Sequence, residues 1–141
     1  MNAGPFPFEA LRRAPDIEGP GLVASDAADR LILDESAAAR AGLGDGELVV
    51  IGDAYGALSL GAVWDGAQGV RVHQDALVGE RALASNAERL GLDDRVTSVA
   101  TQGEELLRGA RVVLTVTGHG LKDPQWALKT ADGSEVQPTS V

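Results

Sequence analysis

Two glycines, Gly52 and Gly56, have the spacing of a cofactor-binding turn. They enclose Asp53, and they directly follow the apolar, β-branched run Leu48–Ile51. Glycine adopts positive φ and carries no side chain, so a turn of this kind lets backbone amides approach a ligand. In a doubly wound sheet such a turn lies at the carboxyl end of a strand, where nucleotide-like cofactors bind. Gly52, Asp53 and Gly56 are therefore the candidate cofactor-binding residues.

The same turn departs from the cofactor-binding pattern at its centre. In a turn of the form G-x-G-x-G the middle glycine would stand where this chain has Ala54, whose methyl group fills part of the space that a ligand needs. Asp53 is the carboxylate of the turn, and there it would repel an acidic ligand. Both substitutions favour a structural strand-to-helix turn over a working cofactor loop.

The elements that position this turn follow from alternating apolar runs and helical periods. Strands are predicted at 48–51, 70–73, 95–100 and 111–116, with helices at 57–64 and 79–90 and a helical turn at 104–108. The order β-α-β-α-β-α-β predicts an α/β fold, in which a Rossmann-like parallel sheet is flanked by helices.

The two ends of the chain carry weaker signals. Four of the six prolines fall in the first twenty residues, which leaves room for one short helix at Phe8–Arg13. Short strands are predicted at Leu22–Ala24 and Leu31–Leu33. Asp34 is then expected to cap a helix over Glu35–Ala41 that Gly42 and Gly44 terminate. Residues 117–141 show no clear period, and 131–141 are polar enough to predict a solvated tail.

Composition excludes several classes of function. A chain of 141 residues with 44% apolar and 4% aromatic residues predicts one domain whose core is built from Ala, Val and Leu. The absence of cysteine excludes disulfides and thiolate zinc sites. A net charge of −9 argues against independent nucleic-acid binding. No long apolar run and no signal pattern occur, so we expect a soluble cytoplasmic protein.

Three stretches resemble one enzyme family: Leu31–Glu35, Val49–Leu58 and Arg81–Leu92 within Val70–Leu92. From Phe8 to about Val113 the chain resembles the N-terminal half of bacterial ribosomal RNA guanine-N2 methyltransferases. The resemblance implies an incomplete class I methyltransferase-like domain over 1–116 that has lost its cofactor site. In that family the C-terminal half is the catalytic domain, which binds S-adenosylmethionine and carries an Asn-Pro-Pro-aromatic motif. This chain lacks that tetrapeptide.

Two further positions agree with a degenerate cofactor site. Methyltransferase turns usually carry a carboxylate two residues before the first glycine, and that position is Val50. A cofactor ribose needs a carboxylate at the end of the second strand. Counting back from Asn86, that position is Gln74, and Asp75 follows one residue late. A slip of one residue turns a side chain to the other face, so Asp75 regains the role only if a bulge intervenes.

The stretch Val112–Lys129 resembles a different family, the C-terminal end of threonine synthase, a pyridoxal-phosphate enzyme. The resemblance rests on its Thr-Gly-x-Gly-Leu-Lys-Asp-Pro string and implies that Thr117 approaches the pyridine nitrogen of the cofactor. The phosphate-binding loop and a Schiff-base lysine in its context are absent, and Lys122 and Lys129 are the only lysines. Residues 117–141 are accordingly treated as a separate C-terminal segment, as in a fused or recombined reading frame, and we expect no bound pyridoxal phosphate.

The remaining polar residues give no catalytic or metal site. His73 and His119 lack converging carboxylates, so each is interpreted as solvent-facing or hydrogen-bonded. Ser59 lacks the Gly-x-Ser-x-Gly frame of a nucleophile elbow. The acidic turn residues (Asp45, Glu47, Asp93 and Asp94) and the Lys122–Trp126–Lys129 stretch are interpreted as solvated surface.

Three hypotheses follow. The first is a non-catalytic methyltransferase-like module, inactive alone and without a cofactor of its own, whose partner is a catalytic methyltransferase domain and, through it, ribosomal RNA. The second is a fragment of a threonine synthase, and the third is a small active methyltransferase that uses S-adenosylmethionine. Val50, Ala54 and Gln74 disfavour the third, and the missing lysine context disfavours the second.

Overall fold

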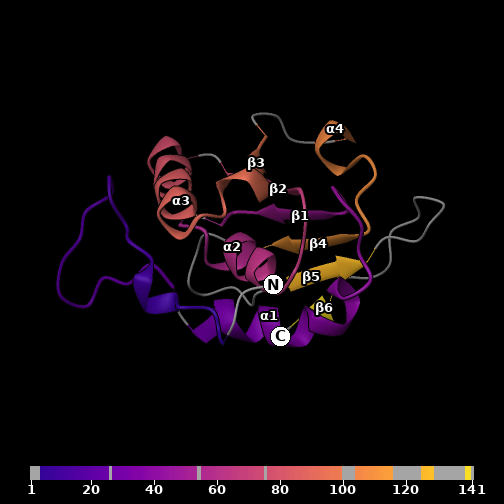
Figure 1. The fold of residues 1–141 in the computed structure, drawn as a ribbon, viewed down its shortest axis with the longest axis horizontal. Helices are drawn as coiled ribbons and strands as arrows, with labels where there is room; N and C mark the ends of the chain where they lie inside the picture. The colour runs from indigo at the N-terminus through magenta and orange to yellow at the C-terminus, as the bar shows by residue number, and fades with distance from the viewer. Residues whose placement is uncertain are drawn as a thin grey trace.

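A six-stranded sheet with the strand order β3-β2-β1-β4-β5-β6 forms the centre of the computed structural model (Figure 1). The structure describes residues 4–25, 27–53, 55–74, 76–99, 104–115, 125–128 and 139–140. The strands are β1 (Leu48–Ile51), β2 (Val70–His73), β3 (Val96–Ser98), β4 (Val112–Thr115), β5 (Gln125–Leu128) and β6 (Thr139–Ser140).

Four of these strands are parallel. β1 pairs with β2 on one side and with β4 on the other, and β3 pairs with β2. β5 runs antiparallel to β4, and β6 antiparallel to β5. The predicted parallel α/β fold with Leu48–Ile51 at its centre is therefore confirmed.

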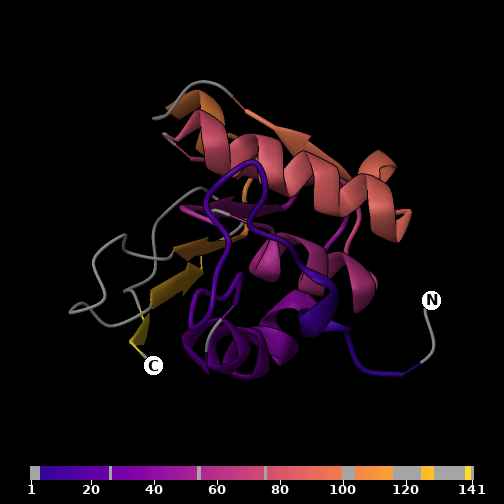
Figure 2. The same ribbon diagram turned by 90° about the vertical axis from the view of Figure 1, so that its left-hand side faces the viewer.

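The strands divide their side chains between two cores because successive residues of a strand point to opposite faces. Val50 lies opposite Val72 and Leu114 in the register, and all three belong to the main core. This core is covered by α1 (Ala27–Arg40), α2 (Ala57–Trp64) and α3 (Leu77–Leu90), as Figure 2 shows. Val49 faces the other way and packs with α4 (Glu104–Leu107) in a smaller core.

The region before β1 differs from the sequence prediction. Leu31–Leu33 is not a strand, and Asp34 does not cap a helix, because both lie inside the single helix α1. The physical reason is a helical period that begins earlier than expected: Ile32, Leu33, Ser36 and Arg40 are buried on one face, whereas Leu31 and Asp34 are exposed. The predicted strand at Leu22–Ala24 is also absent: Leu22 and Val23 are exposed in a loop, and residues 22–24 pair with no strand of the described sheet.

Most other predicted elements are confirmed with small shifts. β1, β2 and α2 have the predicted bounds, whereas α3 begins at Leu77, two residues earlier than expected. The short N-terminal helix is one 3-10 turn, η1 (Phe8–Ala10), and η2 (Asp93–Arg95) precedes β3. No element was predicted after residue 116, yet β5 and β6 continue the sheet there. The rest of the predicted tail, 131–138 and Val141, lies outside the described residues.

The N-terminal segment packs across the helices through its few aromatic residues. Phe6 is buried in the main core, with ring centroids 4.9 Å from Phe8 and 5.7 Å from Trp64. The Trp64 Nε1–H donates a hydrogen bond to the Gly4 carbonyl at 3.0 Å. In the part of the chain that the structure describes, no helix has the length and apolar character needed to cross a membrane.

Gly56 is required where α2 begins. Its φ is +98°, and a Cβ there would lie 2.8 Å from Leu60 Cδ1 and 3.1 Å from Leu60 Cγ. Gly91 also has a left-handed conformation, with a φ of +72°, but a Cβ at Gly91 would meet no atom within 4 Å. Alanine substitution at both glycines therefore measures backbone strain alone at Gly91 and backbone strain together with close packing at Gly56.

We predict that Gly56→Ala destabilises the fold more than Gly91→Ala. Both variants place a side chain at positive φ, which costs about 1–2 kcal/mol. Gly56→Ala adds overpacking against Leu60, worth a further 1–3 kcal/mol or so. Urea denaturation measures the free energy of unfolding of each variant, and equal losses would show that the Leu60 contact does not constrain this position.

Candidate functional site

The candidate site is the turn that joins β1 to α2, at the carboxyl end of the central strand. Gly52 has a φ of +85°, and its amide donates a hydrogen bond to the His73 carbonyl of β2 at 2.9 Å. Gly56, also at positive φ, precedes the first residue of α2. The structure thus places the sequence-predicted residues Gly52, Asp53 and Gly56 together in one strand-to-helix turn, while Ala54 lies outside the described residues.

The Asp53 carboxylate binds the first turn of α2. It accepts hydrogen bonds from the amides of Leu58, at 3.2 Å, and Ser59, at 2.8 Å. The Ser59 hydroxyl donates a further hydrogen bond to it. The amides at a helix N-terminus have no partner within the helix and attract anions. Asp53 therefore supplies from within the turn the negative charge that an external ligand could bring.

Burial changes the protonation chemistry of Asp53. The side chain is 3% exposed, and this desolvation raises its pKa above the ordinary value of 3.8, while the hydrogen bonds from Ser59 act in the opposite direction. A carboxylate this enclosed is not presented to a ligand. The turn is closed on itself, whereas the sequence suggested a carboxylate that faces an incoming ligand.

The positions next to the turn are also occupied by internal contacts. Val50, where a methyltransferase turn carries a carboxylate, is fully buried in the main core. Gln74, at the expected ribose-binding position, donates a hydrogen bond from Nε2 to the Asp53 carbonyl at 2.9 Å. Asp75 and Thr117, the other two predicted cofactor positions, lie outside the described residues.

Asn86 joins the turn to the N-terminal segment. This side chain of α3 is fully buried, and its Nδ2 donates to the carbonyls of Arg12, at 2.9 Å, and Tyr55, at 2.8 Å. Its Oδ1 accepts from the Arg12 amide at 3.0 Å and from the Arg89 guanidinium. One amide side chain thus fixes three parts of the chain that are distant in sequence.

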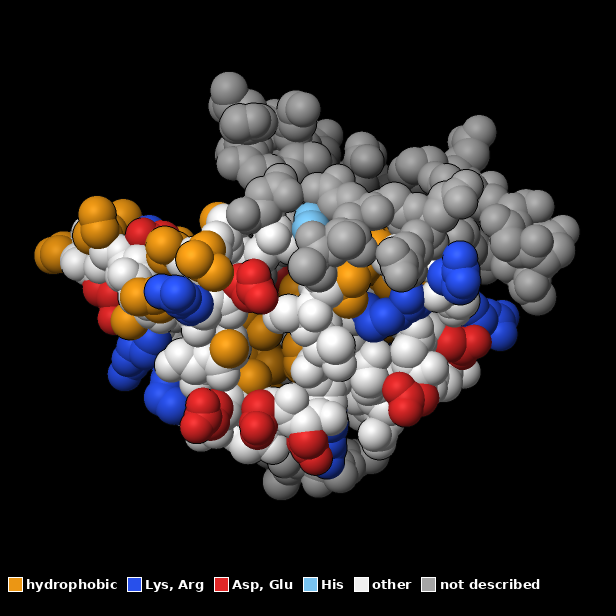
Figure 3. Space-filling model, turned by 90° about the horizontal axis from the view of Figure 1, so that it is seen from above, with side chains coloured by type: hydrophobic (Ala, Val, Ile, Leu, Met, Phe, Trp, Pro, Cys, Tyr) orange, Lys and Arg blue, Asp and Glu red, His pale blue; other side chains and the backbone are white. Residues whose placement is uncertain are grey.

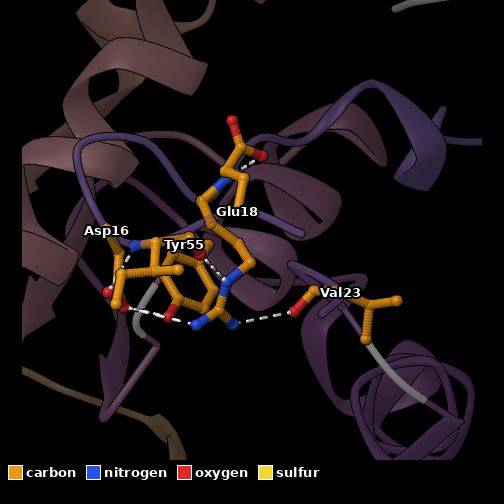
Figure 4. A network of polar contacts seen from close by, with 6 residues as sticks. Asp16, Glu18, Val23 and Tyr55 are labelled. Carbon is orange, nitrogen blue, oxygen red and sulfur yellow. Dashed lines mark hydrogen bonds and ion pairs between the residues drawn. The ribbon is translucent and has the colours of Figure 1, made fainter. Parts of the chain in front are cut away.

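Tyr55 turns its ring toward the N-terminal loop (Figure 4). Its hydroxyl donates to Asp16 Oδ2 at 2.6 Å, and the Arg13 guanidinium lies 4.9 Å from the ring centroid. Arg13 also pairs with Asp16 at 3.5 Å and donates to the carbonyls of Ile17, at 2.7 Å, and Val23, at 3.3 Å. The exposed side of the turn is therefore used for packing within the chain.

These contacts shift two pKa values in opposite directions. Burial and, second, the hydrogen bond to Asp16 raise the pKa of Tyr55 above 10.0. The same hydrogen bond is the main cause that lowers the pKa of Asp16 below 3.8, and the Ile17 amide adds to it. Both shifts therefore favour a protonated Tyr55, whose hydroxyl donates, and an ionised Asp16, whose carboxylate accepts.

The other candidate residues are engaged in the fold. His73 is buried at the end of β2 and donates from Nδ1 to the Val99 carbonyl at 2.7 Å. Glu47 accepts a hydrogen bond from the Gly44 amide at 2.6 Å, and Asp45, Asp93 and Asp94 are exposed. Within the described ranges, no three His, Asp or Glu side chains form a group that could hold a metal ion. His119, Lys122 and Lys129 lie outside those ranges.

Sequence reasoning missed the residues that close the turn. Ser59 was considered only as a nucleophile, and Asn86 only as the reference from which the ribose-binding position is counted. Asn86 could have been found, because an amide in the apolar stripe of an amphipathic helix needs buried hydrogen-bond partners. The Arg13, Asp16 and Tyr55 contacts join residues about forty positions apart, and no short spacing in the sequence indicates them.

The parallel core and the glycine turn after its central strand define a Rossmann-like α/β domain, in which the turn is closed by its own aspartate. A comparison with protein-family models identifies the family within this class. The model for the RLMG N-terminal domain matches residues 4–132, and the chain belongs to this family. The resemblance to the N-terminal half of the guanine-N2 methyltransferases is thereby confirmed.

The same match includes residues 111–129, where the sequence also resembles threonine synthase, and no comparison supports that second resemblance. None of the curated proteins and none of the solved structures compared with the chain matches it.

We predict that Asp53→Ala destabilises the fold by about 2–4 kcal/mol, because two amides and the Ser59 hydroxyl lose their acceptor in a buried place. Asp94→Ala, at an exposed position, is the control and is expected to change stability by less than about 0.5 kcal/mol. Urea denaturation measures both. A loss for Asp53→Ala no larger than that of the control would contradict a structural role for this carboxylate.

The stabilisation by Asp53 also has a predicted pH dependence. A raised pKa means that the folded chain holds this proton more tightly than the unfolded chain. The contribution of the group is therefore fully present below pH 3.8 and decreases as the pH rises through the folded-state pKa. The difference in free energy of unfolding between wild type and Asp53→Ala should therefore become smaller as the pH rises.

Tyr55 can be titrated directly, because it is the single tyrosine of the chain. Ultraviolet absorbance should give a pKa above 10.0 in the folded state. Asp16→Ala should lower it toward that value without reaching it, since burial, the larger cause, remains. The stabilisation by Tyr55 is present below pH 10.0 and lost as the pH rises through its folded-state pKa. An unchanged titration in Asp16→Ala, with Asp94→Ala as control, would disprove the coupling.

Proposed function

We propose that this chain is a non-catalytic module, the N-terminal portion of a ribosomal RNA guanine-N2 methyltransferase. Its role is to assist a catalytic methyltransferase domain, and through that domain it acts on ribosomal RNA in the cytoplasm. Membership of the RLMG N-terminal domain family gives the context of the proposal. The observation that carries it is the Asp53 carboxylate, which occupies the amides of α2 inside the turn where a cofactor would bind.

The chemistry around the turn supports the absence of a cofactor. Val50 and Gln74 provide no carboxylate at the two positions where an S-adenosylmethionine site would need one. Each lost hydrogen-bonded contact to a ligand costs about 1–3 kcal/mol, so two losses weaken binding by roughly two decades or more. We accordingly propose that the chain alone binds neither S-adenosylmethionine nor pyridoxal phosphate and transfers no methyl group.

An exposed apolar surface supports an interaction role. Ile17, Leu22 and Val23 are 74%, 46% and 61% exposed in the N-terminal loop that Arg13 fixes. The loop projects from one end of the molecule in Figure 1, and hydrophobic side chains gather at the same end in Figure 3. Exposed apolar groups on a fixed loop are typical of protein contacts. With a net charge of −9, we propose a protein contact here and no strong independent binding to nucleic acid.

We predict that the chain shows no heat of binding with S-adenosylmethionine in calorimetric titration up to millimolar concentration. A catalytic guanine-N2 methyltransferase domain, which carries the Asn-Pro-Pro-aromatic motif, is the positive control. A dissociation constant in the low micromolar range for the chain would favour the alternative, a small active methyltransferase.

Methyl transfer to a ribosomal RNA fragment, followed with labelled S-adenosylmethionine, tests the assisting role. The chain alone should transfer no label, and it should increase transfer by the separately purified catalytic domain. Ile17→Ser/Val23→Ser should reduce that increase, whereas Leu77→Ser, at a position 57% exposed on α3, should leave it unchanged. No effect of the chain on the catalytic domain would contradict the proposed module.

A further inference from the structure

A pocket of about 600 Å³ lies at the end of α2 opposite the β1 turn, between the last turn of α1 and the loop after α2. Its volume is in the range of small-molecule sites. Five of its seven lining residues carry no polar side-chain group, and the other two are one arginine and one aspartate. The lining residues are Ala37, Arg40, Ala41, Leu43, Asp65, Gly66 and Ala67.

Arg40 is a buried cation held in one position. The residue is 7% exposed, although arginine is rarely buried unless it is paired. Its Nε donates to the Ser36 hydroxyl at 3.0 Å, and its NH2 donates to the Leu33 carbonyl at 2.7 Å. Both partners lie on α1, so the guanidinium is already ordered before any ligand arrives, which reduces the entropy lost on binding.

The outer edge of this guanidinium has a poor partner. NH1 and NH2 both face a single oxygen, Asp65 Oδ2, and each lies 3.4 Å from it. A well-formed arginine–carboxylate pair uses two parallel hydrogen bonds of about 2.7–2.9 Å. The Asp65 side chain is itself 55% exposed. A buried charge is thus matched by a long contact to a solvated carboxylate that can turn away.

We propose that this pocket binds a small monocarboxylate with an apolar body. The ligand carboxylate would take the outer edge of Arg40 in place of Asp65, and its body would lie against Ala37, Leu43 and Ala67. Burial lowers the pKa of Arg40, the direction expected for a cation whose charge is not fully compensated. Asp65 and the nearby Asp34 disfavour a ligand with a second negative charge.

Isovalerate is the probe, and isovaleramide, which has the same shape without the charge, is its control. Amide NMR of the labelled chain at millimolar ligand should show saturable shifts confined to α1 residues 37–41 and to 65–67 with isovalerate. Isovaleramide should bind at least about tenfold more weakly than isovalerate, because it cannot form the charge-assisted pair with Arg40. Equal shifts with both compounds, or shifts elsewhere, would overturn the proposal.

Three variants test the site without removing Arg40, whose loss could unfold the chain. Asp65→Asn removes the competing charge and should tighten isovalerate binding about two- to fivefold, in line with the modest strength of an exposed ion pair. Ala37→Phe should fill the pocket and weaken binding at least about tenfold. Ala38→Phe, at the next exposed position of α1 and outside the lining, should bind as wild type does.

The ligand pair and the three variants together distinguish a ligand site from a purely structural ion pair. If Arg40 and Asp65 serve only to join α1 to α2, Asp65→Asn will lower stability and no variant will bind isovalerate. That result, or equal weakening by Ala37→Phe and Ala38→Phe, would refute the site. The proposed assisting role would stand in either case, because the pocket and the β1 turn lie at opposite ends of α2.

Discussion

A carboxylate removed from water needs hydrogen-bond donors, and Asp53 finds them in the first turn of α2. This contact fixes the angle at which the central strand passes into the helix that covers it. α2 then places Leu58, Leu60 and Val63 in the main core against β1 and β2. The same donors are those that an external anion would need. The interaction that orders the turn therefore already engages these donors within the chain.

The N-terminal segment contacts the same turn from outside. Asn86 lies in the buried stripe of α3, where it forms hydrogen bonds with the backbone of Arg12 and Tyr55. Tyr55 directs its hydroxyl to Asp16 and its ring to Arg13. Through these described contacts, the turn joins the strand, the helix and the N-terminal segment.

The two ends of α2 differ in how well their charges are matched. At its start, the buried Asp53 carboxylate accepts hydrogen bonds from two amides, at 3.2 and 2.8 Å, and from the Ser59 hydroxyl. At its end, Arg40 is equally enclosed on its inner side, but its outer edge meets only a long contact to Asp65 beside an open pocket. Close hydrogen-bond donors therefore lie where the sheet topology would suggest a site, and a more distant counter-ion lies where it would not.

The residue types along the chain were enough to predict the parallel core and the departure of the turn from the cofactor-binding pattern. β1, β2 and α2 follow from short apolar runs and glycine punctuation, and the losses at Val50 and Ala54 are visible as residue types. The local sequence pattern predicted a strand at Leu31–Leu33, which is wrong. These residues belong to the helix α1, whose buried face is formed by Ile32, Leu33, Ser36 and Arg40. β5 and β6 were missed because short strands at the edge of a sheet are specified by their partners.

The contacts of the polar residues of the turn could not be predicted in this way, because they depend on how distant elements pack. Whether Asp53 faces a ligand or a helix depends on where α2 lies, and the partners of Asn86 and Tyr55 come from a segment more than thirty residues away. The pocket beside Arg40 likewise forms between two helix ends that share no sequence motif. Hydrogen bonding and charge compensation depend on distances of a few ångströms, and those distances are set by the packing of elements rather than by spacing along the chain.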